Sequence, residues 1–222
     1  NWSFNLLEPA PATRDGWWMS ENASQHAAHG YSSERLRLWN ADGKMTIWCS
    51  SQGQFMVRAY TARVCGMEVA KIKVVPSEIG GGFGGKTTIY HEPIGIVLSR
   101  KSGRPVKLVM NREEVFRATG PTSGAKIKMR IGAKADGTLV AGETQLVFEA
   151  GAFRGSPVGA ACMCVFTPYK IANFFIEGLD VVLNKPKVAA YRAPGSPIAA
   201  FALEQLMDEL ALTLGRDPID LR

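Results

Sequence analysis

Long apolar segments and segments of a single charge sign are both absent from this sequence. No apolar run approaches the roughly 20 residues that a membrane-spanning helix needs, which excludes a helical membrane protein. The net charge is +6, but the 26 Lys and Arg residues are spread along the chain and form no dense cluster. Neither a zinc finger nor a basic motif interleaved with aromatic residues occurs, so the sequence does not indicate a nucleic-acid-binding protein.

Cysteine and histidine are also scarce, with four cysteines and three histidines in 222 residues. Cys162 and Cys164 are separated by one residue, whereas zinc knuckles commonly have two. His26, His29 and His91 form no ligand set with them, and ordinary surface or capping roles are expected for these histidines. We therefore expect no side-chain metal site and four reduced, mostly buried thiols, as in a cytoplasmic protein.

The length and composition suit one large domain or two smaller ones. A hydrophobic content of 46% is ample for a packed core. We expect an N-terminal linker or insertion over residues 1–32, a first α+β unit over 33–120 and a second over 121–222. The chain starts at Asn1 without a methionine or a signal peptide, and from this we expect a fragment of a longer protein.

The first half of the chain predicts a hairpin followed by helices and further strands. Residues 35–39 alternate polar and apolar side chains, and Asp42-Gly43 supplies a turn before residues 45–48. Helical spacing runs from Gln54 to Val64, where Gly66 is placed to end it. The next expected elements are a strand over about 71–75, a helix through 94–98 that ends near Gly103, and a strand over 105–109.

The second half repeats the hairpin theme. Residues 126–131 alternate, Asp136-Gly137 turns, and residues 138–149 run back. A further strand is expected over about 174–183. The last helix is predicted with Ser196 as its N-cap and Pro197 as its first residue. Two hairpin-plus-helix units of this kind predict an α+β fold with mixed or antiparallel sheets.

A glycine-rich loop from Gly80 to Thr87, with the sequence GGGFGGKT, admits two chemical interpretations. It satisfies the phosphate-loop pattern, in which Lys86 would reach the phosphates of a nucleotide and Thr87 would hold magnesium. Alternatively, Phe83 and its glycines approach a metal cofactor, and the lysine is structural. A phosphate-loop domain alternates strands and helices around a parallel sheet, so the expected architecture argues against nucleotide hydrolysis. The nucleotide-binding interpretation stays as the alternative.

Several ordered segments together resemble the molybdenum hydroxylases, the family of xanthine dehydrogenase and aldehyde oxidoreductase. They come in that family's order, at close to its spacing, across nearly the whole chain. The segments are Leu7-Glu8-Pro9, Ser50-Ser51-Gln52-Gly53, Gly80 to Lys86, Arg104 to Leu108, Asn111 to Glu114, Asn184-Lys185-Pro186, Ala190-Tyr191-Arg192 and Leu203 to Ala211. The resemblance implies the first molybdenum-cofactor-binding domain of the large, molybdopterin-binding subunit, with the fold of the aldehyde oxidoreductase domain.

The resemblance also assigns roles to particular residues. Gln52 would hydrogen-bond an oxo ligand of molybdenum, Phe83 and Gly84 would wall the metal, and Arg192 and Ala193 would lie on the substrate side. Catalytic roles are implied for Gln52, Phe83 and Arg192. The full set implied to bind the cofactor is Gln52, Gly82, Phe83, Gly84, Gly85, Arg192 and Ala193.

By the same resemblance, the enzyme oxidises a carbon centre with water as the oxygen source. The implied cofactor is molybdenum-molybdopterin, with the cytosine dinucleotide as one form of the pterin. The implied partners are a second molybdenum-binding domain, iron–sulfur and FAD subunits in a multi-subunit complex, and a small organic substrate, with no nucleic acid and no membrane. The family's catalytic glutamate lies in a Gly-x-Gly-Glu segment of that second domain, and no such segment occurs here. We therefore expect the isolated chain to be inactive.

The substrate class is partly constrained by departures from the family pattern. Purine-oxidising members carry a glutamate where Thr87 stands, and an arginine in the segment around Ala160-Ala161-Cys162, where none occurs. Members that oxidise carbon monoxide have a cysteine at the position of Ala193. The resemblance therefore favours an aldehyde or an N-heteroaromatic substrate over xanthine or carbon monoxide.

Overall fold

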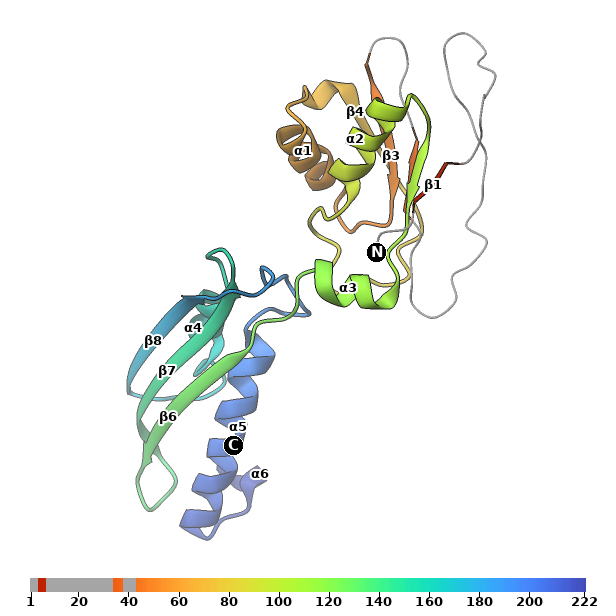
Figure 1. The fold of residues 1–222 in the computed structure, drawn as a ribbon. Helices are drawn as coiled ribbons and strands as arrows, with labels where there is room; N and C mark the ends of the chain where they lie inside the picture. The colour runs from red at the N-terminus through yellow and green to blue at the C-terminus, as the bar shows by residue number, and fades with distance from the viewer. Residues whose placement is uncertain (1–3, 7–33, 38–42) are drawn as a thin grey trace. The chain divides into compact units, whose positions relative to one another are not determined.

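The computed structural model describes residues 4–6, 34–37 and 43–222 (Figure 1). The chain divides into two compact units, Asn1–Thr119 and Gly120–Arg222, and each is described by itself. Most of the expected linker over residues 1–32, and the Asp42-Gly43 turn in part, lie outside the described residues.

The first unit contains a five-stranded mixed sheet. Its strands are β1 (Phe4–Leu6), β2 (Glu34–Arg37), β3 (Met45–Cys49), β4 (Ile72–Pro76) and β5 (Val106–Leu108), in the order β1-β5-β2-β3-β4. The predicted hairpin is confirmed, since β2 and β3 pair antiparallel with Arg35 opposite Trp48. β4 lies parallel to β3, with Met45 opposite Ile72. All other pairings in this sheet are antiparallel.

Two helices pack on this sheet through one apolar core. The helices and turns of the unit are α1 (Gln54–Val64), the 3-10 turn η1 (Val69–Lys71), α2 (Glu92–Ser102) and α3 (Arg112–Ala118). In β3 buried and half-buried residues alternate, so Met45, Ile47 and Cys49 face one side. They pack with Val57 of α1 and Ile96 of α2. The predicted helix ends are confirmed at Gly66 and Gly103, which both adopt positive φ.

The second unit contains a three-stranded mixed sheet covered by helices. Its elements are β6 (Ala125–Ala133), β7 (Leu139–Gly151), α4 (Val158–Cys164), β8 (Asn173–Val182), α5 (Ser196–Leu214) and α6 (Pro218–Leu221). β6 pairs antiparallel with β7, and β8 pairs parallel with β7 through the crossover that contains α4. The predicted α+β fold with mixed sheets is confirmed.

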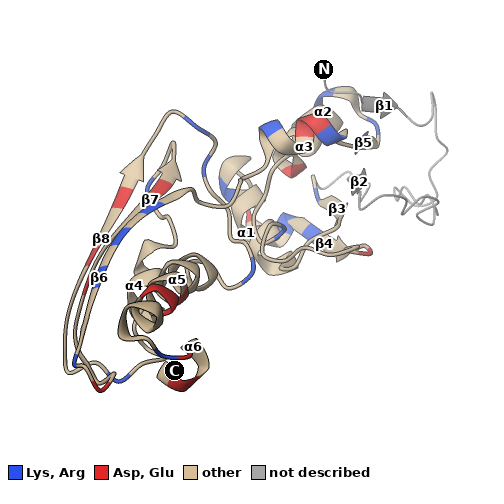
Figure 2. Ribbon diagram, turned by 90° about the horizontal axis from the view of Figure 1, so that it is seen from below, with Lys and Arg blue, Asp and Glu red and all other residues tan. Residues whose placement is uncertain are grey.

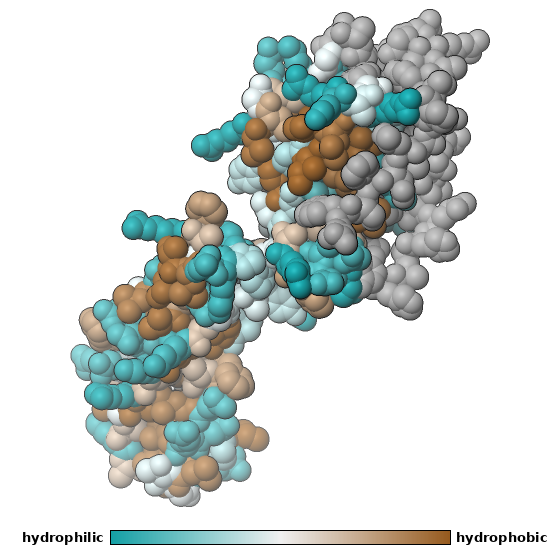
Figure 3. All heavy atoms as spheres, viewed as in Figure 1, coloured by the Kyte–Doolittle hydropathy of each residue, from teal (hydrophilic) through white to brown (hydrophobic). Residues whose placement is uncertain are grey.

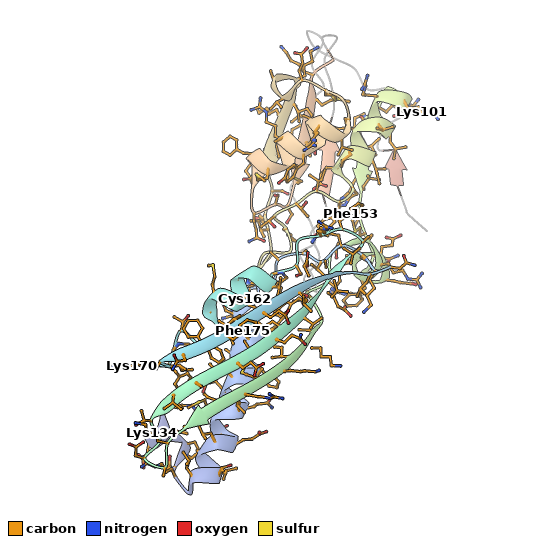
Figure 4. The ribbon with its side chains drawn as sticks, turned by 90° about the vertical axis from the view of Figure 1, so that its left-hand side faces the viewer. Lys101, Lys134, Phe153, Cys162, Lys170 and Phe175 are labelled. Carbon is orange, nitrogen blue, oxygen red and sulfur yellow. The ribbon has the colours of Figure 1, made fainter. Side chains whose placement is uncertain are left out.

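The helix α5 supplies one side of the core of the second unit. Its buried residues Ala199, Leu203 and Met207 recur at intervals of four and pack against Leu146 and Phe148 of β7. α4 lies on β8, where a Cβ atom on Gly178 would come within 2.6 Å of the Cys162 sulfur (Figure 4). The absence of a side chain at position 178 therefore allows the close approach of helix and strand.

One local prediction is wrong, and another holds only in part. Gly195, with φ 91°, is the N-cap of α5, and Ser196 is already its first helical residue. A Cβ atom on Gly195 would lie 2.5 Å from the carbonyl oxygen of Pro157, so the chain at this point admits only a glycine. His91 is 6% exposed, so the expected surface role does not apply; it is the N-cap residue of α2, but its side chain makes no capping bond. His26 and His29 lie outside the described residues.

The four cysteines are free, as predicted, but only Cys49 is fully buried. Burial raises the pKa of the Cys65 and Cys162 thiols above the ordinary value, which keeps both thiols protonated near neutral pH. Within the described ranges, no group of three or more His, Cys, Asp or Glu side chains could hold a metal ion.

The surface carries both charge signs and some apolar side chains. Figure 2 shows Lys, Arg, Asp and Glu distributed over both units in the described part of the chain. Apolar surface is visible on each unit in Figure 3, and the exposed apolar residues include Phe55, Val64 and Phe201. None of the helices formed by the described residues is both long enough and apolar enough to cross a membrane.

We predict that Asp180 makes the stability of the second unit depend on pH. Its carboxylate accepts hydrogen bonds from the backbone N–H groups of Gly155 (2.9 Å) and Ser156 (3.0 Å) ahead of α4. Hydrogen bonds from Ser156 and Gly155 hold the pKa of Asp180 below its ordinary value of 3.8. A carboxyl group with a depressed native pKa contributes stability that is complete above about pH 5 and is lost as the pH falls through the native pKa.

The measurement is urea unfolding of the wild type and of Asp180→Asn between neutral and acidic pH. The wild type is expected to be more stable near neutral pH, and its advantage should shrink steadily below about pH 5. Asp220→Asn is the control, since the Asp220 carboxylate accepts no hydrogen bond from the described residues. An advantage of the wild type that stays constant with pH would contradict the prediction.

Candidate active site

Gln52 lies in the turn that joins β3 to α1. Ser50 and Ser51 follow β3 and are each 2% exposed, whereas the side chain of Gln52 is exposed. The backbone N–H of Gln52 donates to the carbonyl oxygen of Lys86 at 2.9 Å. The main chain of the turn is therefore bound directly to the far end of the glycine loop.

The side chain of Gln52 is bound to the same loop. Its Oε1 accepts hydrogen bonds from the backbone N–H groups of Gly84 (2.9 Å) and Lys86 (3.2 Å). Because both partners are donors, the amide oxygen faces the loop and the NH₂ group faces away from it. No described residue accepts a hydrogen bond from this NH₂ group, which leaves two N–H donors for a ligand. The structure thus brings together two of the predicted segments, Gln52 and the glycine loop.

The glycine loop has the backbone geometry that its composition predicts. Gly80, Gly81 and Gly84 have φ of 60°, 98° and 97°, which only glycine adopts readily. A Cβ atom on Gly82 would lie 2.5 Å from Oε1 of Gln52, so position 82 requires glycine for a different reason. The Gln52 side chain thus occupies the place that a Cβ atom on residue 82 would take.

Some residues other than glycine also adopt a left-handed backbone conformation. In the described part of the chain, the non-glycine residues with positive φ are Phe83 (52°), Arg192 (22°) and Ala193 (52°). Such conformations cost about 1–3 kcal/mol and cluster at functional sites. All three are residues to which the sequence resemblance gives a role. The apolar ring of Phe83 is 65% exposed.

Arg192 and Ala193 belong to the second unit, in the turn that leads into α5. Both side chains are exposed, and Gly195 behind them packs against Pro157 in the loop that Asp180 holds. This packing supports the strained turn from one side. The exposed guanidinium of Arg192 is available for an anionic or polar ligand.

The geometry does not support phosphate binding by the glycine loop. The Lys86 ammonium donates to Oγ of Ser50 (2.9 Å) and to the carbonyl oxygen of Ile79. The Thr87 hydroxyl donates to the carbonyl oxygen of Gly84 at 2.8 Å. The next helix, α2, begins at Glu92, whereas a phosphate loop opens directly into its helix. Both side chains that would serve a nucleotide are engaged within the protein.

The site offers a hydrogen-bond donor, and its glycine loop carries no carboxylate. The NH₂ group of Gln52 is a donor without a partner among the described residues, whereas the N–H groups of Gly84, Gly85 and Lys86 are bonded within the protein. Residues 79–87 contain no carboxylate. Such a donor suits a ligand with acceptor oxygens, such as an oxo-metal group. The residues present therefore fit a molybdenum cofactor whose metal ligands come from the cofactor itself.

One contributor was missed by the sequence reasoning. The hydroxyl of Tyr90 donates to the carbonyl oxygen of Gly85 at 2.9 Å and so fastens the loop at its second end. A tyrosine five residues after a glycine carries no recognisable signal in a single sequence.

Comparison with known proteins shows the family to which the chain belongs. The family model described as molybdopterin cofactor-binding domain matches residues 24–222, and the chain belongs to this family. The chain is 34% identical over 186 residues to a probable xanthine dehydrogenase subunit from Bacillus subtilis, covering 82% of this chain and 25% of that protein. It is 33% identical over 191 residues to the aldehyde oxidoreductase of Megalodesulfovibrio gigas, covering 82% of this chain and 20% of that protein.

A solved structure supports the fold independently. Quinoline 2-oxidoreductase from Pseudomonas putida 86 matches with a TM-score of 0.78 and 27% sequence identity, covering 86% of this chain and 25% of that chain. The chain therefore has the fold of a molybdenum hydroxylase cofactor-binding domain. It spans a quarter or less of the length of these three proteins.

We predict that Gly82→Ala detaches Gln52 from the loop. The added methyl group would overlap Oε1, so the side chain must leave and both of its accepted hydrogen bonds are lost. The expected loss is about 1 kcal/mol in the free energy of unfolding, measured by urea titration.

The matched control is Gly159→Ala in α4, where an added Cβ atom meets nothing within 4 Å. That variant should be as stable as the wild type or more stable by up to about 1 kcal/mol. Equal stability of Gly82→Ala and the wild type, with Gln52 still bound to Gly84, would refute the stated role of Gly82.

Proposed function

We propose that this chain forms the part of a molybdenum hydroxylase that places hydrogen-bond donors against the molybdenum cofactor. The proposal gives this donor role to Gln52, and it gives the loop residues Gly82, Phe83, Gly84 and Gly85 a contact with the cofactor. It gives Arg192 and Ala193 a contact with the cofactor or the substrate. The observation that carries it is the coincidence of positive φ at Phe83, Arg192 and Ala193 with membership of the family.

The roles follow from the chemistry of each group. When bound, molybdenum-molybdopterin supplies two-electron oxidation of a carbon centre with water as the oxygen source. The NH₂ group of Gln52 donates to an oxygen of the cofactor, because its own Oε1 is held by Gly84 and Lys86. Donors that are already oriented stabilise developing negative charge without reorganisation. The ring of Phe83 excludes water from the same side, and the charge of Arg192 attracts an anionic or polar substrate group.

The proposed substrate is an aldehyde or an N-heteroaromatic compound. Thr87 and the segment Ala160-Ala161-Cys162 lack the charged side chains expected for a purine. The hydroxyl of Thr87 donates to Gly84, so this residue supports the loop. Two of the similar proteins named above, an aldehyde oxidoreductase and a quinoline 2-oxidoreductase, are named for these two substrate classes. The third is named as a probable xanthine dehydrogenase subunit, so the choice against a purine rests on position 87 and on residues 160–162.

The remaining parts of the proposal concern the whole enzyme. They are a second molybdenum-binding domain that carries the catalytic glutamate, iron–sulfur and FAD domains or subunits that accept the electrons, and a cytoplasmic location. The cytosine dinucleotide is the proposed form of the pterin. This chain covers only 25% and 20% of the length of the two relatives named above, which supports further domains or subunits.

The test uses the full-length protein with its partner subunits. Metal analysis should find about one molybdenum per polypeptide, and an aldehyde or a quinoline should reduce an added dye. Gln52→Leu should lower kcat by about 10²-fold, the usual effect of removing one donor to developing charge. Gln145→Leu is the control, because Gln145 donates to Glu177 on the sheet of the second unit.

Two results would contradict the proposal. The first is a correctly assembled protein that contains no molybdenum and oxidises neither class of compound. The second is unchanged kcat in Gln52→Leu. Tight, magnesium-dependent ATP binding that is lost in Lys86→Met would instead revive the nucleotide interpretation.

A further inference from the structure

Lys86 is attached to the β3–α1 turn by both its side chain and its main chain. The half-buried ammonium donates to Oγ of Ser50 at 2.9 Å and to the carbonyl oxygen of Ile79. Ser50 itself is 2% exposed and donates to the same carbonyl at 3.1 Å. The ammonium thus joins the end of β3 to Ile79, which directly precedes the glycine loop.

The main chain of Lys86 binds the next two residues of the turn. Its carbonyl oxygen accepts from the backbone N–H of Gln52 (2.9 Å) and from Oγ of Ser51 (3.2 Å). Its N–H donates to Oε1 of Gln52 at 3.2 Å. Three consecutive residues, Ser50, Ser51 and Gln52, therefore each bind Lys86.

We propose that Lys86 is a positioning residue that sets the orientation of the Gln52 amide. The ammonium holds both ends of the loop on the β3–α1 turn, so that the N–H groups of Gly84 and Lys86 stay directed at Oε1 of Gln52. With the oxygen held there, the NH₂ group is the part of the amide that a ligand meets. The effect of Lys86 on catalysis rests on the proposed function, whereas the effect of Lys86 on the conformation of the loop does not.

The charge of Lys86 is suited to this role. A hydrogen bond from an ionised donor is roughly twice as strong as one between neutral groups. The five glycines between Gly80 and Gly85 have little intrinsic preference for one conformation, so the loop depends on such external bonds. Methionine at position 86 would keep the apolar stem and remove every side-chain donor. Arginine would keep the charge and several donors.

The first experiment measures amide hydrogen exchange by mass spectrometry in the full-length protein without substrate. In Lys86→Met, exchange of the backbone amides at positions 84 and 86 should rise by at least about 10-fold, because Oε1 of Gln52 no longer protects them. Lys86→Arg should exchange within a few-fold of the wild type. Lys101→Met on α2 is the control, since Lys101 is an exposed lysine of the same unit (Figure 4).

The second experiment is a double-mutant cycle on turnover by the assembled enzyme. Lys86→Met should lower kcat by about 10-fold or more, with KM and molybdenum content within about twofold of the wild type. Lys86→Arg should recover most of that loss. In a Gln52→Ala background, Lys86→Met should lower kcat no further, because a residue that acts through Gln52 has nothing left to position.

The outcomes separate this inference from the proposed function. Unchanged exchange in Lys86→Met, or a further 10-fold fall in kcat in the Gln52→Ala background, would overturn the positioning role. A wild-type protein without molybdenum would contradict the proposed function, and the exchange experiment alone would then decide the role of Lys86. If Lys86→Met does not fold, Ser50→Ala removes one acceptor of the ammonium and should raise exchange at the same two positions.

Discussion

The arrangement of the candidate site depends on one interaction, in which the amide oxygen of Gln52 accepts two backbone N–H groups from the glycine loop. This interaction decides which end of the amide faces outward. It also explains why position 82 has no side chain, since a Cβ atom there would overlap the same oxygen. Neither the flexible Gln52 side chain nor the glycine loop has a strong conformational preference of its own. The hydrogen bonds between them hold both in a single geometry.

The secondary-structure elements of the fold hold the predicted site segments in place. β3 and β4 are adjacent parallel strands, so the turn after β3 and the loop after β4 emerge from the same edge of the sheet. The buried residues of β3, α1 and α2 hold those strands in place. In the second unit, the packing of Gly195 on Pro157 supports the strained turn at Arg192 and Ala193. Strain of this kind persists only where the surrounding structure enforces it.

Local periodicity and turn chemistry predicted most of the elements, whereas the tertiary contacts were beyond a single sequence. The β2–β3 hairpin and α1 follow from alternation and helical spacing, because those patterns reflect burial on one face. The start of α5 was misplaced by one residue, because the contact of Gly195 with Pro157 overrides the preference of Ser196 for capping. The glycine loop satisfied two motifs, and the position of the Lys86 ammonium, bonded to Ser50 and Ile79, distinguishes them.

The most direct measurement is anomalous diffraction at the molybdenum absorption edge from crystals of the assembled enzyme. The account predicts one strong peak beside the glycine loop, with an oxygen ligand of the metal about 3 Å from Nε2 of Gln52. Oε1 should still accept from Gly84 and Lys86. A molybdenum peak remote from Gln52, or a Gln52 side chain turned into the solvent in the loaded enzyme, would contradict it.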